Sequence, residues 1–426
     1  MRRRLLILAG LLLALLSARA QGFREEVYAN LNKAGGVYFL YPFQAHQVTP
    51  PPKGFTPVYL SHYGRHGARY LLNETQYERS LGVLKAAHEQ GALTPEGERI
   101  WAVARAYFEE TCQYRYGDLT PLGWDQHYRI AQEIYRDNRQ LFRRHPAVTA
   151  GATQVPRCIV SMTAFCQGLA RMDPSLAIYA SASTAQLDEL NPHSKENPRR
   201  VSPVMEEGRY SRKDPWGTDL KSFVERHVDY RGIAARIFRD PDFPKPFRGT
   251  RAFVLDFYDL VFNMQCTPTE RSLMDFFTPD ECYALWEVNN YIHYMEAAPP
   301  ATRRDQPALE NLVADADRAL AAGKPAVRLR FGHDTVFLFL ISALGADGFG
   351  IVPSRADDIS ATWANFRSPM AATFYLLFCR NKAGKVLFKL VLNGEEATLP
   401  LTPVSGPWYD WDQMKALLHE TQNLSI

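Results

Sequence analysis

The stretch V-Y-L-S-H-Y-G-R-H-G-A-R-Y, residues 58–70, begins as a strand and ends in positive charge. Its first residues, Val58 to Leu60, favour a pleated and buried strand. Gly64 and Gly67 then interrupt the pattern and allow the backbone to come close to a ligand. The sequence therefore predicts a central strand that carries charged side chains into a loop at its carboxyl end.

Two guanidinium groups flank an imidazole in this loop, at Arg65, His66 and Arg69. Planar guanidiniums bind phosphate oxygens in pairs, and an imidazole held between them can attack phosphorus. These residue types predict a phosphate monoester site with His66 as the nucleophile. A turn with solvated side chains is the alternative, and residues elsewhere in the chain have to decide between the two.

The letters R-H-G-A-R at residues 65–69 resemble the R-H-G-x-R signature of the histidine acid phosphatases, the phytase-like branch of the phosphoglycerate mutase superfamily. Far downstream, R-F-G-H-D-T-V-F at residues 330–337 is similar to the H-D motif of that family. The resemblance implies a phosphoglycerate-mutase-like α/β domain with an inserted, mostly helical smaller domain. It also implies hydrolysis through a phosphohistidine.

His333 and Asp334 follow a run, Pro325 to Phe331, that alternates as a strand. Ligands bind at the carboxyl ends of strands in open α/β sheets, and a helix predicted at Val336 to Leu344 directs its N-terminus to the same place. We expect His333 to donate to phosphoryl oxygens and Asp334 to protonate the leaving alkoxide.

Arg157 opens R-C-I-V-S-M-T-A-F-C-Q-G-L at residues 157–169, whose apolar positions have helical spacing. A cation is unfavourable at a helix N-terminus unless an anion is bound there. The segment resembles the R-x-x-x-S-x-x-x-F-x-x-G-L helix that carries the third phosphate-binding arginine of the family. An ordinary surface arginine is the alternative.

Two segments match the L-T-x-x-G element that opens a helix after the first catalytic segment in the family. One is L-T-P-E-G at residues 93–97, and the other is L-T-P-L-G at residues 119–123. Both combine a threonine N-cap with a proline at the first helical position, so each predicts a helix start.

The middle of the chain has a different composition. A polar break at residues 191–198 and an exit at 297–300 enclose helical patterns at 221–228, 233–238, 250–263 and 279–295. By resemblance, residues 188–300 form the inserted helical domain, and residues 21–187 and 301–426 form the α/β phosphatase domain. Several basic residues of the predicted helical domain either face a polyanionic substrate or are solvated: Arg199, Arg200, Lys213, Arg226 and Arg231. The run Tyr291–Tyr294 is interpreted as core and rim.

Residues 1–20 have the pattern of a signal peptide, with early arginines, a short apolar run, and small residues at Ala18 and Ala20. We expect cleavage before Gln21, a periplasmic or secreted enzyme, and no stable membrane insertion afterwards. An uncleaved anchor is the alternative.

The charges are nearly balanced, with 49 Lys and Arg against 46 Asp and Glu in the whole chain. The first 20 residues carry four arginines and no acid, which leaves 45 basic against 46 acidic residues after cleavage. Such a chain has no global field to attract nucleic acid, so the predicted partner is a small phosphomonoester bound by a local cluster.

Six cysteines are compatible with disulfides in an exported protein, and Cys266 with Cys282 is the pair that we expect. No C-x-x-C or H-E-x-x-H pattern is present, so the sequence predicts neither a metal nor another cofactor. The alternative is a metal-binding reading of His333 and Asp334, with further ligands from scattered residues.

Two runs within residues 369–401 read as a closing hairpin. The sequence L-N-G-E-E-A-T-L-P-L at 392–401, together with Y-F-L-Y-P-F at 38–43, resembles the corresponding segments of the multiple inositol polyphosphate phosphatases. His333-Asp334-Thr335 departs from the His-Ala-Glu of that subfamily. We expect inositol polyphosphate hydrolysis, with sugar phosphates as alternative substrates and an organic-phosphate binding protein or a mutase as remote alternatives.

Overall fold

A mixed sheet forms the centre of the α/β part, in the computed structural model, which describes residues 22–200, 216–299 and 303–424. The strand order is β3-β2-β4-β1-β5-β6-β7, with β8 paired to β6. The strands are β1 (Phe55–Arg65), β2 (Ala147–Ala152), β3 (Ile178–Ala182), β4 (Ala326–Gly332), β5 (Thr373–Asn381), β6 (Val386–Leu392), β7 (Glu395–Glu396) and β8 (Tyr409–Asp410). The chain thus has the predicted α/β class.

The parallel strands bring three chain segments to one edge of the sheet. β4 pairs in parallel with both β1 and β2, so that Arg65 lies opposite Gly332 and Ala152 lies opposite Phe331. β5 joins the other side of β1 in the antiparallel direction. The residues that follow β1, β2 and β4 therefore meet at the carboxyl edge, in agreement with the strands predicted to begin at residues 58–60 and to cover residues 325–331.

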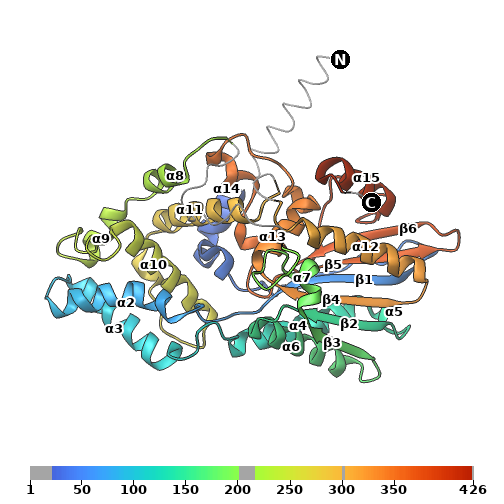
Figure 1. The fold of residues 1–426 in the computed structure, drawn as a ribbon, viewed down its shortest axis with the longest axis horizontal. Coiled ribbons are helices and arrows are strands. Elements are labelled where there is room, and N and C mark those ends of the chain that lie inside the picture. The colour runs from blue at the N-terminus through green and yellow to red at the C-terminus, as the bar shows by residue number, and fades with distance from the viewer. Residues whose placement is uncertain (1–21, 201–215, 300–302, 425–426) are drawn as a thin grey trace, which may run out of the picture.

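Helices cover both faces of this sheet (Figure 1). On one face, α4 (Pro121–Asp137) packs against α6 (Pro156–Met172), and α6 lies on β2 and β4. On the other face, α12 (Gln306–Ala322) and α13 (Asp334–Ala343) contact β1. Buried leucine, valine and phenylalanine side chains fill both interfaces.

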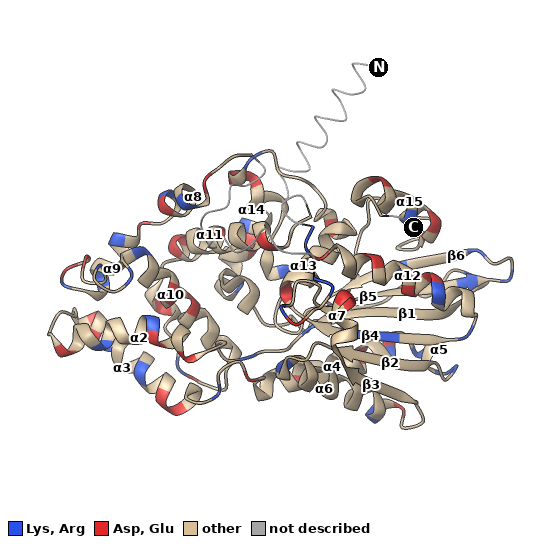
Figure 2. Cartoon of the chain, viewed as in Figure 1, with Lys and Arg blue, Asp and Glu red and all other residues tan. Residues whose placement is uncertain are grey.

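The helical part lies beside the sheet in Figure 1 and combines two chain segments. It contains α2 (Glu74–Glu89), α3 (Pro95–Tyr107), α8 (Leu220–His227), α9 (Tyr230–Ile237), α10 (Thr250–Asn263) and α11 (Pro279–Ala297). Because α2 packs on α10 and α3 on α9, the region draws on residues outside 188–300 as well. The division of the chain into domains at 187 and 301 stays a prediction. Figure 2 shows acidic and basic residues mixed along these helices.

All six cysteines are free thiols, so the predicted Cys266–Cys282 disulfide is wrong. The Cys266 thiol donates instead to the carbonyl of Tyr38, at 3.1 Å. Cys282 is buried in the first turn of α11. Each thiol therefore lies in a separate buried environment. The spacing of the two cysteines along the chain does not reveal this separation.

The predicted signal peptide, residues 1–20, lies outside the described residues. In the part of the chain that the structure describes, no helix has both the length and the apolar character that crossing a bilayer demands.

Candidate active site

His66 lies at the first position after β1 and is only 2% exposed. Its backbone N–H donates to the carbonyl of Gly332, at 3.1 Å, which ties the loop to the end of β4. Its Nδ1 is 3.0 Å from the carbonyl oxygen of Gly67. Because a carbonyl oxygen can only accept, Nδ1 carries the proton and Nε2 keeps a lone pair.

Two helices hold the loop that follows. The Gly67 N–H donates to Ser161 Oγ at 3.1 Å, and the Ala68 N–H donates to Gln126 Oε1 at 2.9 Å. A Cβ on Gly67 would lie 2.5 Å from the carbonyl oxygen of Gly123, so the backbones of the loop and α4 touch. Glycine at both positions permits this approach.

The structure separates the two L-T-x-x-G segments. Thr120, the N-cap of α4, donates its N–H to the carbonyl of Ala68 at 2.8 Å, so residues 119–123 lie against the loop. Thr94 caps α3 and donates its N–H to the carbonyl of Ile237, in the helical part. Only the segment at 119–123 supports the site.

Three arginines surround His66. Arg65 is fully buried; its Nη1 donates to the carbonyls of Val37 (2.5 Å) and Ser368 (2.6 Å), and its Nη2 lies 2.8 Å from Asp334 Oδ2. Arg69 donates through Nη1 to the carbonyl of Tyr70, at 2.9 Å.

Arg157 stands in the first turn of α6, and its buried Nε has no hydrogen-bond partner among the described residues. Burial, together with the neighbouring charge of Arg69, lowers the pKa of Arg157 to about 10. A buried donor without a partner is unfavourable unless a ligand supplies one.

His333 and Asp334 start α13, directly after β4. The His333 ring is edge-on to that of His66, with the ring centres 5.8 Å apart. Its Nε2 lies 3.4 Å from Oγ1 of Thr153, which follows β2. Asp334 accepts the Thr335 N–H at 2.9 Å and uses its other oxygen on Arg65.

The charges leave both imidazoles neutral. Burial, followed by the charges of Arg157 and Arg65, lowers the pKa of His66 far below its usual value. Burial and Arg157 lower the pKa of His333 to about 3. Burial raises the pKa of Asp334, but Arg65 and His293 outweigh it, so this carboxyl is ionised in the free protein.

The structure thus brings together Arg65, His66, Arg69, Arg157, His333 and Asp334, all the residues predicted for the site. The structure adds His293 of α11, which is 8% exposed and influences the pKa of Asp334. From the sequence, its segment is interpreted as core and rim, because nothing local connects His293 with Asp334, which lies 41 positions further along the chain.

Two of the basic residues that were candidates for contact with a polyanionic substrate form ion pairs on the surface. Arg226 pairs with Asp357 at 2.7 Å, and Arg231 pairs with Asp242 at 2.8 Å, both on the surface. Lys213 lies outside the described residues. Arg226 and Arg231 therefore have the solvated, paired character that was the alternative to substrate binding.

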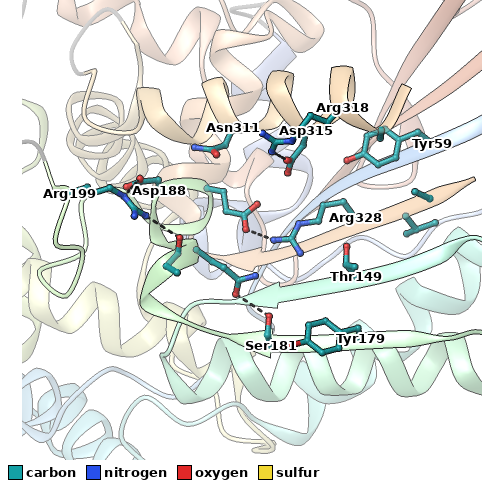
Figure 3. Close-up of a pocket in the computed structure, with 16 residues that line it drawn as sticks. Tyr59, Thr149, Tyr179, Ser181, Asp188, Arg199, Asn311, Asp315, Arg318 and Arg328 are labelled. Carbon is teal, nitrogen blue, oxygen red and sulfur yellow. Dashed lines mark hydrogen bonds and ion pairs between the residues drawn. The ribbon is translucent and has the colours of Figure 1, made fainter. Parts of the chain in front are cut away.

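A hollow of about 740 Å³ lies elsewhere, between α12 and strands β2, β3 and β4 (Figure 3). Its charges form ion pairs within the wall, namely Arg328 with Glu189 and Arg199 with Asp188. His66 does not line it, so this hollow is distinct from the candidate active site. Within the described residues, no three His, Cys, Asp or Glu side chains are grouped as metal ligands.

The family model of the histidine phosphatase superfamily (branch 2) matches residues 64–393, which include the loop at His66 and the His333–Asp334 pair. The chain belongs to this family. It is accordingly a phosphatase that hydrolyses phosphoric monoesters. A comparison of the sequence with curated proteins gives no match.

Solved structures share the fold of this histidine phosphatase at low sequence identity. The multiple inositol polyphosphate phosphatase of Bifidobacterium longum, in complex with phosphate, is 17% identical, with a TM-score of 0.73 over 91% of this chain and 97% of that one. The Hafnia alvei phytase is 14% identical, with a TM-score of 0.58 over 87% and 98%. The phytase of D. castellii is 13% identical, with a TM-score of 0.63 over 92% and 85%.

Proposed function

We propose that this protein is an exported phosphatase that hydrolyses inositol polyphosphates through a phosphohistidine at His66. The observation that carries the proposal is the state of His66: Nδ1 is held by the Gly67 carbonyl, and three arginines surround the ring. This arrangement suits an Nε2 nucleophile that remains neutral down to low pH.

In the first step, Nε2 of His66 attacks phosphorus. Arg65, Arg69 and Arg157 neutralise the phosphoryl oxygens, and His333 donates a hydrogen bond to them. Because Arg65 and Arg69 are already buried and hydrogen-bonded to backbone carbonyls, their charges stabilise the transition state with little reorganisation. Positioning and electrostatics supply most of the rate enhancement.

Asp334 must carry a proton to act as the general acid, whereas Arg65 keeps its pKa low in the free protein. A bound phosphate dianion compensates the positive charge of Arg65 and Arg69 and repels the carboxylate, so it raises the pKa of Asp334. Substrate binding thereby favours the protonated acid, which gives its proton to the leaving alkoxide as the P–O bond breaks.

The second step reverses these roles. The Asp334 carboxylate accepts a proton from a water molecule, whose oxygen attacks phosphorus, and the N–P bond breaks. This step restores neutral His66 and protonated Asp334; once inorganic phosphate leaves, Asp334 gives its proton to water and is ionised again, as in the free protein. All groups required are present in the chain, so the cycle uses no metal or other cofactor.

The substrate class is supported by two likenesses. The sequence at residues 38–43 and 392–401 resembles that of the multiple inositol polyphosphate phosphatases. The structure of the Bifidobacterium longum enzyme of that name has been solved in complex with inositol hexasulfate. Export to the periplasm or the medium is supported by the pattern of residues 1–20. Sugar phosphates are the alternative substrates.

A substrate panel tests the proposal. We expect phosphate release from inositol hexakisphosphate at acid pH, with slower release from glucose 1-phosphate and glycerophosphate. EDTA should leave the rates unchanged, whereas loss with chelator and recovery with zinc would favour a metal site. Rapid turnover of glucose 1-phosphate alone would contradict the substrate class, and binding without any release would indicate a binding protein.

A further inference from the structure

A second group of charges lies beside the catalytic residues. Asp305, at the start of α12, is fully buried, and its Oδ1 is 2.7 Å from Nδ1 of His193. Its Oδ2 is 3.3 Å from an Nη of Arg304. The His193 side chain is 24% exposed, so the imidazole reaches solvent while its carboxylate partner does not.

Backbone contacts place the segment of His193 against the end of β4. The Tyr63 hydroxyl donates to the carbonyl of Leu190 at 2.8 Å and accepts the His333 N–H at 3.3 Å. A Cβ on Gly332 would lie 2.7 Å from the same Leu190 carbonyl. The helix that precedes this segment, α7 (Leu187–Leu190), packs against both α12 and β4.

Electrostatics agree with this placement. The charge of His193 contributes to the lowered pKa of His333, after burial and Arg157. Two basic side chains, His193 and Arg304, share one carboxylate, and both lower the pKa of Asp305 against the effect of its burial. The cluster therefore carries a net positive charge when the imidazole is protonated.

The chemistry of this cluster suits an anion. Asp305 takes Nδ1–H of His193, so Nε2–H of the protonated ring is the donor that Asp305 does not use. A partly buried imidazolium beside a guanidinium binds a phosphate group well, because little hydration has to be removed. The six catalytic-site residues hold one phosphoryl group and give no preference among polyphosphates.

We propose that His193 and Arg304, held on Asp305, bind a second phosphate group of the substrate next to the phosphoryl group at His66. This inference rests on the proposed function and deepens it: the pair selects substrates with more than one phosphate. His193 and Arg304 are specificity residues that touch the substrate away from the reacting bond.

The test replaces His193 by glutamine and measures binding and turnover at pH 5, where an ordinary imidazole is protonated. We expect the calorimetric affinity for inositol hexasulfate to fall about tenfold in His193→Gln, as for loss of one charge-assisted contact. The affinity for inorganic phosphate and the kcat/KM for phenyl phosphate should stay within about twofold. The kcat/KM for inositol hexakisphosphate should fall about tenfold, mainly through KM.

His88→Gln is the matched control, because His88 also pairs through Nδ1 with a carboxylate, Glu98 at 2.6 Å, but lies on α2 in the helical part. It should change none of these quantities. Unchanged hexasulfate affinity in His193→Gln would overturn the inference, and so would equal losses on phenyl phosphate and the inositol compound. If the wild type releases no phosphate from the hexakisphosphate while His193→Gln still lowers the affinity for hexasulfate, the proposed function fails and the second site stands. If the wild type releases phosphate but does not bind hexasulfate, the second site fails and the proposed function stands.

Discussion

At His66, one hydrogen bond leaves Nε2 as the nitrogen with a free lone pair, the atom that we propose attacks phosphorus. The Gly67 carbonyl fixes the proton on Nδ1, and burial among arginines keeps the second proton away from Nε2. In water an imidazole near pH 5 would be mostly protonated and unable to attack. The site thus keeps the proposed nucleophile neutral under acid conditions by the same charges that we propose bind the substrate.

Replacement of Asp334 by asparagine should separate two kinds of substrate. Alkyl phosphates need a protonated leaving oxygen, so their kcat should fall about 100-fold or more. The kcat for p-nitrophenyl phosphate, whose leaving group needs little protonation, should fall far less. Steady-state kinetics of Asp334→Asn with glycerophosphate and p-nitrophenyl phosphate measure the difference, and equal losses would remove Asp334 from the role of acid.

Much of the site could be predicted at the residue scale because its residues lie in short local patterns. Arg65, His66 and Arg69 lie at the end of β1 and in the loop after it, His333 and Asp334 lie together at the start of α13, and Arg157 lies in the first turn of α6. The positions of His193 and His293 near the site could not be predicted, because each depends on residues far away in the sequence. His193 is held by Asp305, and His293 lies close enough to Asp334 to influence its pKa.

At the scale of elements, α4 sets the position of the catalytic loop through a contact between backbones. A Cβ on Gly123 would lie 2.4 Å from the carbonyl oxygen of Ala68, so Gly123→Ala must push the loop and the helix apart. Displacement of a nucleophile by a fraction of an ångström slows the reaction strongly. We therefore expect kcat/KM to fall at least tenfold. Kinetics and thermal unfolding of the purified variant check this.

Gly82 of α2 offers the control, because a Cβ there would meet nothing within 4 Å. Gly82→Ala should leave kcat/KM unchanged and stabilise the protein by about 0.5–1 kcal/mol, as expected for alanine in a helix interior. Normal activity in Gly123→Ala would show that the close contact with α4 is not what positions the loop.

Helices with strong periodicity were predictable as elements. The pattern at 250–263 coincides with α10, and that at 279–295 falls within α11. The strands β2 and β3 were not predicted, because A-V-T-A-G-A and I-Y-A-S-A are short and rich in small residues. β3 pairs in parallel with β2, and β2 pairs in parallel with β4 as well, so their strand conformation is a tertiary effect.

At the scale of the whole molecule, buried neutral histidines connect stability with pH. His127, behind the catalytic loop, is 1% exposed and packs on Phe331, and burial lowers its pKa to about 3. In the unfolded chain a histidine takes up a proton near pH 6.5. The unfolded state therefore binds more protons between about pH 6.5 and 3, and stability falls as the pH falls through this window.

Each such histidine should cost about 2 kcal/mol of unfolding free energy between pH 7 and pH 5. His127→Phe tests this, because phenylalanine fits an aromatic environment and does not titrate. Denaturant unfolding of both proteins at pH 7 and 5 should show a loss on acidification that is smaller by about 2 kcal/mol in the variant. Equal losses in the two proteins would mean that His127 is not neutral in the folded state.

The measurement that tests the phosphohistidine most directly is rapid quench of the enzyme with substrate labelled in the phosphoryl group, followed by peptide mapping under alkaline conditions. We expect label on His66 within the first turnover in the wild type. We expect no label, and at least about 1000-fold lower turnover, in a folded His66→Ala variant. Label on another residue, or near-normal turnover in His66→Ala, would contradict the mechanism.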